Sequence, residues 1–155
     1  MFSFFKKSWI PKLLPIMREE DYHTHFVGRT SDGKQFFGYE TFVFPARTPG
    51  QDWEKLRKEY VVLYTFDSKG NHINTNHWYA GTTAEISADT TRSKLMEMVD
   101  RLGPIEYCDI AVKPFKTIID GVEFGLIPDD ETESIELQPS STIAFSEPWD
   151  GEYDT

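Results

Sequence analysis

Three tight-turn signals, each set between two strand-like runs, constrain the fold of this chain more than any other feature. Asp32-Gly33, Gly70-Asn71 and Asp120-Gly121 supply residues that accept the positive φ angles of short hairpin turns. The flanking runs are rich in aromatic and β-branched residues, as strands are. The sequence therefore predicts three β-hairpins, built from residues 22–30 with 35–44, 60–66 with 72–80, and 117–120 with 122–127. Further strands are expected at 105–112, at 134–138 and in a short piece at 142–145.

Two helices fit between these strands. Leu95, Met98, Val99 and Leu102 recur at the spacing of one apolar helix face. Ser87 or Asp89 can begin this helix, and Gly103-Pro104 ends it. A short charged helix is expected over 52–58. Hairpins combined with an amphipathic helix predict an α+β fold, with a largely antiparallel sheet of about six to seven strands and the longer helix packed on one face.

Length and composition predict one domain with a substantial core. The chain has 155 residues with twelve Phe, seven Tyr and four Trp, enough large side chains to exclude a disordered protein. Residues 1–20 form a basic and apolar arm, too short and too charged to span a bilayer, and residues 21–155 form the domain. We expect Phe4, Phe5 and Trp9 of the arm to pack on the fold, although its lysines could also lie on an anionic membrane surface. Cys108 is the only cysteine, which suits a reducing compartment.

Charge is distributed unevenly along the chain. The net charge is −10, yet no Lys or Arg follows Lys116, whereas eleven Asp or Glu do. This end of the molecule should repel nucleic acid, and a macromolecular partner that binds there should present a basic surface. The competing interpretation is that the acidic surface only keeps the protein soluble.

The stretch "DYHTHF", residues 21–26, has the spacing of a partial metal site. On a strand, His23 and His25 would point to the same side, and a third ligand could come from His77, His72 or a carboxylate. No HExxH motif and no cysteine pair accompanies them. Solvated strand histidines are the simpler interpretation, and no cofactor is predicted.

The stretch "NTNHWYAGT" would have polar and apolar side chains on both faces of a strand. On a regular strand His72, Asn74, Asn76 and Trp78 share one face, and Ile73, Thr75, His77 and Tyr79 share the other. Asn74, Asn76 and Trp78 are therefore candidates for binding a small ligand or a peptide. The alternative is an edge strand whose polar residues prevent aggregation.

The C-terminal stretch "SEPWDGEYDT" places two large aromatic residues among four carboxylates. A disordered tail seldom spaces such residues around a turn, so we expect it to dock. Docked on its own domain it is structural, with Trp149 largely buried and the carboxylates near Lys6, Lys7 and Lys12. Docked on another chain, Trp149, Asp150 and Tyr153 would form an acidic and aromatic recognition element.

Three segments, residues 21–45, 60–82 and 136–155, resemble a bacterial protein family without a known activity, whose members are sometimes labelled formate hydrogenlyase regulatory protein. The resemblance implies a bacterial cytoplasmic protein and supplies no catalytic residues. No helix-turn-helix or basic face supports DNA binding.

The sequence thus predicts a domain that binds a protein with a basic surface, as a regulator does, or as an immunity protein does when it blocks a nuclease toxin. We predict no catalytic residue. The alternative is a small-ligand or metal-dependent protein that uses the histidines.

Overall fold

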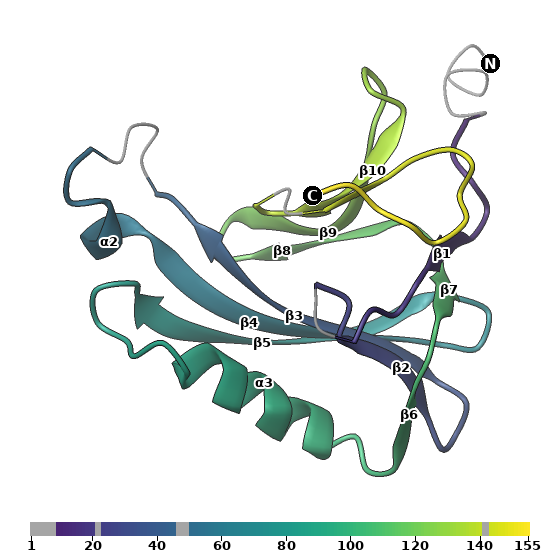
Figure 1. Cartoon of the computed structure of the whole chain (residues 1–155), viewed down its shortest axis with the longest axis horizontal. Coiled ribbons are helices and arrows are strands. Elements are labelled where there is room, and N and C mark those ends of the chain that lie inside the picture. The colour runs from purple at the N-terminus through teal and green to yellow at the C-terminus, as the bar shows by residue number, and fades with distance from the viewer. Residues whose placement is uncertain (1–8, 21–22, 46–49, 141–142) are drawn as a thin grey trace.

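The computed structural model describes residues 9–20, 23–45, 50–140 and 143–155 of the chain. These residues form three layers, seen edge-on in Figure 1. A five-stranded sheet lies in the middle, with helix α3 (Thr90–Asp100) on one face and a four-stranded sheet over the other. All strand pairings are antiparallel. The fold is therefore α+β, as the sequence predicts.

The five-stranded sheet has the order β5-β4-β3-β2-β6. Its members are β2 (Phe26–Thr30), β3 (Gln35–Val43), β4 (Lys58–Phe66), β5 (His72–Thr82) and β6 (Ile105–Tyr107). The first two predicted hairpins are present here as β2-β3 and β4-β5. Gly33 and Gly70 adopt positive φ angles in their turns, and the Asp67 carboxylate accepts hydrogen bonds from the backbone amides of Lys69 and Asn71.

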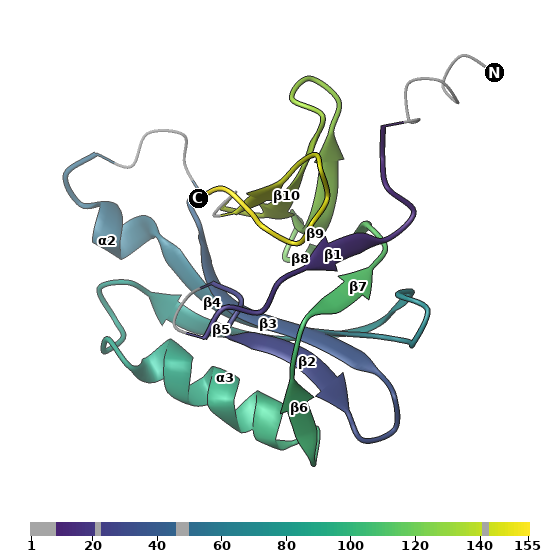
Figure 2. The same cartoon turned by 45° about the vertical axis from the view of Figure 1, so that its right-hand side comes forward.

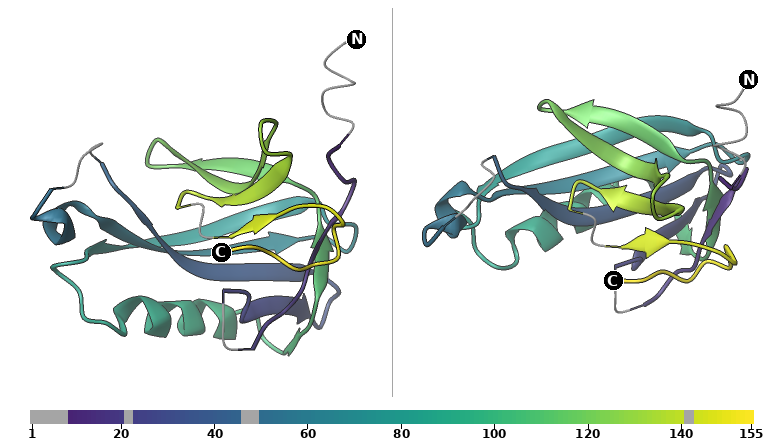
Figure 3. Two further views of the ribbon diagram at one scale, coloured as in Figure 1. Left: turned by 45° about the horizontal axis from the view of Figure 1, so that its top comes forward. Right: turned by 90° about the horizontal axis from the view of Figure 1, so that it is seen from above.

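The four-stranded sheet is built from the C-terminal third of the chain. Its order is β11-β10-β9-β8, with β8 (Phe115–Ile119), β9 (Val122–Asp129), β10 (Ser134–Gln138) and β11 (Ala144–Phe145). Asp120 and Gly121 both have positive φ angles and close the third predicted hairpin. Seen from above, this sheet lies across the five-stranded one (Figure 3).

A third sheet has two strands and pairs a segment near the N-terminus with one from the second half of the chain. In it β1 (Leu14–Ile16) pairs with β7 (Ile110–Val112), which continues from β6 after a break at Cys108 and Asp109. Figure 2 shows this pair at one side of the two larger sheets, where they pack on each other. Leu14 and Ile16 are completely buried, so this part of the predicted arm is a component of the core.

Two apolar clusters hold the layers together. The larger lies between the two large sheets and includes Phe37, Tyr64, Phe66 and Phe124. The smaller joins α3 to the middle sheet through Leu95, Met98 and Val99, three members of the predicted apolar stripe. The fourth, Leu102, is only partly buried at its edge. Burial of these side chains is the main stabilising contribution to the fold.

The structure corrects the prediction of one large sheet. The strands form three sheets, because β8 to β11 turn away after Val112 and pack face to face on the middle sheet instead of extending its edge. Short strands such as β1, β6 and β7 give too few residues for a period-2 pattern to show in the sequence. The sequence predicts one strand over 105–112, but the structure has two strands there, β6 and β7, in two different sheets.

The shorter helix is also corrected. α2 spans only Trp53–Leu56, and Lys58, expected in the helix, begins β4 opposite Val43. Arg57 has an extended backbone, and its guanidinium lies 5.0 Å from the Trp53 ring centroid. The pairing of Lys58 with β3 therefore ends the helix earlier than the charged residues of the sequence suggest.

Candidate functional site

The C-terminal segment docks on its own domain. Beyond β11 it turns at Trp149, which has a positive φ angle, and returns so that Asp154 and Ala144 exchange two backbone hydrogen bonds. The Met17 amide also donates to the Gly151 carbonyl oxygen at 3.0 Å. The yellow segment accordingly runs beside β1 in Figures 1 and 2.

An acidic hollow lies between this returning segment and residue 19. It encloses about 410 Å³ and is lined by five carboxylate side chains together with Ser146, Pro148 and Tyr153. The carboxylates belong to Glu19, Glu147, Asp150, Glu152 and Asp154. No Lys or Arg lines it, within the part of the chain that the structure describes. A hollow with this lining favours a cationic group.

Tyr153 forms one wall of the acidic hollow and is held firmly. Its ring packs edge-to-face on Phe145, and its hydroxyl lies 3.1 Å from the Thr24 hydroxyl. Partial burial raises the pKa of Tyr153, so the phenol stays neutral at physiological pH. A neutral aromatic ring among carboxylates can contact the side chain of a lysine or an arginine.

Trp149 does not line the acidic hollow but helps to dock the C-terminal segment on the domain. It is half-buried and stacks on Trp9 of the arm, with the ring centroids 6.3 Å apart. The Trp9 indole donates to Asp130, so the arm, the C-terminal segment and the β9-β10 turn meet here. The tail thus folds back as predicted, although the indole is less enclosed than expected. Lys12 makes no ion pair with a described carboxylate, and Lys6 and Lys7 lie outside the described residues.

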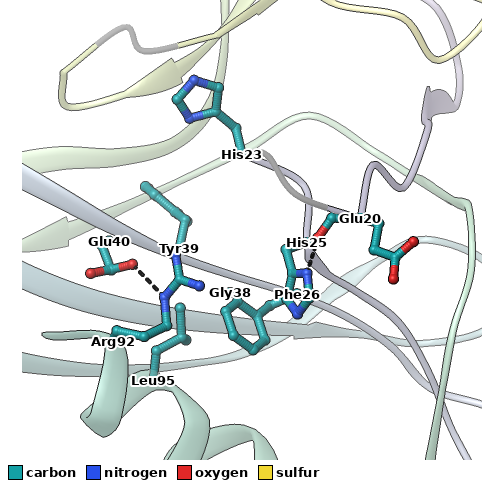
Figure 4. Close-up of a pocket in the computed structure, with 9 residues that line it drawn as sticks. All are labelled: Glu20, His23, His25, Phe26, Gly38, Tyr39, Glu40, Arg92 and Leu95. Carbon is teal, nitrogen blue, oxygen red and sulfur yellow. Dashed lines mark hydrogen bonds and ion pairs between the residues drawn. The ribbon is translucent and has the colours of Figure 1, made fainter. Parts of the chain in front are cut away.

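The two histidines of "DYHTHF" lie in a turn and not on a strand, because β2 begins only at Phe26. Figure 4 shows His23 pointing away from His25, whose Nδ1 faces the Glu20 carbonyl oxygen. Burial lowers the pKa of His23, and the nearby Glu19 opposes this effect. Asp21 and Tyr22 lie outside the described residues.

The metal-site alternative requires His23, His25 and His77 to converge, and the described residues do not show such a convergence. His77 is exposed on β5, three strands away from β2 in the middle sheet. Within the described ranges, no group of three or more His, Cys, Asp or Glu side chains could hold a metal ion. The three histidines therefore do not form one site.

The polar strand β5 is an edge of the middle sheet. Asn74 and Asn76 are exposed there, whereas Trp78 is half-buried next to α3, with the Lys94 ammonium 5.4 Å from its ring centroid. The position at an edge agrees with the alternative of a polar strand that resists aggregation.

A bulge changes which residues share a face of β5. His72 pairs with Phe66 and Asn74 with Thr65, so Ile73 is an extra residue. His72 consequently faces the core between the sheets, stacked on Phe115 at 4.4 Å, and not the side of Asn74. Burial in this position lowers the pKa of His72.

Sequence reasoning missed a polar cluster beside α3. The Arg92 Nε atom donates to Glu40 of β3 at 3.0 Å, and the Thr91 hydroxyl donates to the other Glu40 oxygen at 2.5 Å. Glu40, Arg92 and His25 border a hollow of about 380 Å³ (Figure 4). Glu40 and Arg92 are 52 residues apart in the sequence, and no local pattern connects them.

Cys108 is partly buried between β6 and β7, and burial raises the pKa of its thiol. At neutral pH it is therefore protonated and weakly nucleophilic.

Comparisons with known proteins add no relative: no family model, no curated protein and no solved structure matches the chain. The resemblance described above therefore stays a prediction. No helix among the described residues is long and apolar enough to cross a membrane.

Proposed function

We propose that this protein is a cytoplasmic binding domain of a bacterial cell that acts without catalysis, and that its acidic hollow receives a partner protein with a basic surface. The acidic hollow at the C-terminal segment is the observation that carries the proposal. Five carboxylates surround it, and the segment that supplies four of them is fixed to the domain by backbone hydrogen bonds. A fixed array of charges binds an opposite charge with little cost in conformational entropy.

The charge distribution of the whole chain supports the same partner. All sixteen Lys and Arg residues lie within the first 116 positions, and none of those that the structure describes lines the hollow. Electrostatic complementarity of this kind accelerates association and selects among partners. A regulator that covers a basic surface, or an inhibitor that imitates a phosphate backbone for a nuclease, would each use such a site.

Affinity capture from the native host with quantitative mass spectrometry tests the proposal. The test variant is Glu147→Gln/Glu152→Gln/Asp154→Asn, three exposed lining residues. The matched control, Glu54→Gln/Glu106→Gln/Glu131→Gln, removes the same charge from other exposed positions. We expect the wild type and the control to retain a basic partner that the test variant loses. Equal retention by all three proteins would contradict the proposal.

The alternative, a ligand-binding protein that uses the histidines, is favoured by one observation only. His25 borders the hollow beside α3 together with Arg92.

A further inference from the structure

A third hollow lies between α3 and β6, on the side of the middle sheet that faces away from the four-stranded sheet. It encloses about 300 Å³, and its lining includes His25, Phe26, Arg92, Met96 and Tyr107. The hollow beside Gly38 and Glu40 shares three of these residues, namely His25, Phe26 and Arg92. The two hollows therefore adjoin at these residues, and together we call them the groove; each is of a size that suits a small ligand.

The floor of this groove is aromatic. The His25 ring centroid lies 4.5 Å from that of Phe26 and 5.4 Å from that of Tyr107. Tyr107 is 40% exposed and Met96 is 53% exposed, and both face the same hollow. These two side chains offer a ligand an apolar surface to cover.

Arg92 is held in place at the junction of the two hollows. Its Nε atom donates to Glu40, which also accepts the Thr91 hydroxyl. Its guanidinium carbon lies 5.3 Å from the Phe26 ring centroid. The bond to Glu40 uses Nε alone, so both η nitrogens can serve a ligand. Figure 4 shows the guanidinium between Glu40 and the Phe26 ring. An oriented guanidinium is the side chain best suited to a carboxylate.

Asp100 also lines the groove, at the C-terminal end of α3. It follows Arg92 by eight residues on α3, about 12 Å along the helix axis at 1.5 Å per residue. Its carboxylate repels a second anionic group at that end. Arg18, which lies 4.5 Å from the Tyr107 ring centroid, is held by the His25 carbonyl oxygen and does not neutralise Asp100.

We propose that this groove binds a small monocarboxylate with a flat apolar body. The carboxylate bonds to the η nitrogens of Arg92, and the body covers the rings of Phe26 and Tyr107. The site differs from the acidic hollow in charge and in the elements that form it, so the inference does not depend on the proposed function. The competing explanation is that the Arg92–Glu40 pair only fastens α3 to the sheet.

The probe is 2-naphthoate, added to the full chain and followed by amide chemical shifts in NMR. We expect saturable shifts that centre on Phe26, Met96 and Tyr107. Acetate, which lacks the apolar body, and 2-naphthalenemethanol, which lacks the charge, should each bind at least about tenfold more weakly, as expected when a charge-assisted bond or a buried ring is lost. The 2,6-dicarboxylate of naphthalene should also bind more weakly, because its second charge meets Asp100.

Three variants decide between a ligand site and a helix anchor. Arg92→Gln should weaken 2-naphthoate binding by about tenfold or more. Arg101→Gln, which removes an exposed charge just beyond the end of α3, should leave it unchanged. Asp100→Asn should improve binding of the dicarboxylate but not of 2-naphthoate, an effect that damage to the fold would not produce. Absence of saturable shifts, shifts centred elsewhere, or equal affinity in Arg92→Gln would overturn the proposal.

Discussion

At the scale of single residues, close backbone contacts decide where the fold tolerates change. Gly28 lies on β2 opposite Tyr107 of β6, and an added Cβ would lie 2.1 Å from the Glu106 carbonyl oxygen. A backbone atom cannot move aside as a flexible side chain can. Gly33 differs, because its Cβ would meet nothing within 4 Å and only its positive φ angle disfavours a side chain.

We therefore predict that Gly28→Ala lowers the free energy of unfolding by about 3 kcal/mol, since overpacking here displaces β6. Gly33→Ala, the control, should cost only about 1 kcal/mol. Urea denaturation followed by circular dichroism measures both. Equal losses would show that β6 adapts to the added methyl group without strain.

Tyr60 gives a prediction on pH. Burial, reinforced by a 2.8 Å hydrogen bond to Asp120, raises the pKa of Tyr60 to about 12. The unfolded chain ionises near pH 10, so the stabilisation is complete below about pH 10 and is lost as the pH rises towards 12. Urea denaturation at pH 8 and at pH 11 should show this loss, and Tyr60→Phe should show a smaller one. An unchanged pH dependence in the variant would mean that other groups cause it.

The sequence predicted single residues well only where the chain is locally regular. The turn glycines and the apolar stripe of α3 follow from local rules and were confirmed. The orientation of His72 depends on a bulge, which the register between β4 and β5 sets and the alternation of polar residues does not reveal. The Arg92–Glu40 contact likewise arises only when α3 packs on β3.

At the scale of elements, the ends of the chain stabilise each other. β1 supplies two completely buried side chains, and the C-terminal segment covers this region through the Trp9–Trp149 stack and the Met17–Gly151 hydrogen bond. Such pairing between distant segments contributes to the stability of the whole domain, and neither segment can form it alone.

Truncation after Ser146 should consequently lower the melting temperature by several degrees or more, since each kcal/mol corresponds to about 2–4 °C in a chain of this size. Trp149→Ala should account for about 1–2 kcal/mol of the loss, because the indole is only half-buried. Differential scanning calorimetry measures both. A truncated protein that melts like the wild type would show that docking of the segment contributes nothing to stability.

Hairpins were predictable at this scale, whereas the division into sheets was not. A hairpin depends on a turn and its two neighbours in the sequence. The pairing of β1 with β7 joins residues almost a hundred positions apart, and the packing of the four-stranded sheet on the middle one depends on the larger apolar cluster. Stretches of two or three residues, such as β11 and β6, gain their strand conformation from such contacts.

At the scale of the whole molecule, the two candidate sites have opposite character. The acidic hollow lies at the C-terminal segment, and the groove with Arg92 lies beside α3. The sequence predicted the excess of negative charge at the C-terminal end, and the structure shows five carboxylates gathered around one hollow, including Glu19 from the other end of the chain. The position of Glu19 beside the C-terminal carboxylates was not predictable, because it depends on how the two ends of the chain dock.

The salt dependence of partner binding tests the central claim most directly. For the basic partner captured with the wild type, the dissociation constant is measured from 50 to 200 mM NaCl by isothermal titration calorimetry. We expect binding to weaken steeply with salt for the wild type and for the Glu54/Glu106/Glu131 control, and to be weaker and less dependent on salt for the Glu147/Glu152/Asp154 variant. A dissociation constant indifferent to salt, or the same salt dependence in all three proteins, would contradict the account.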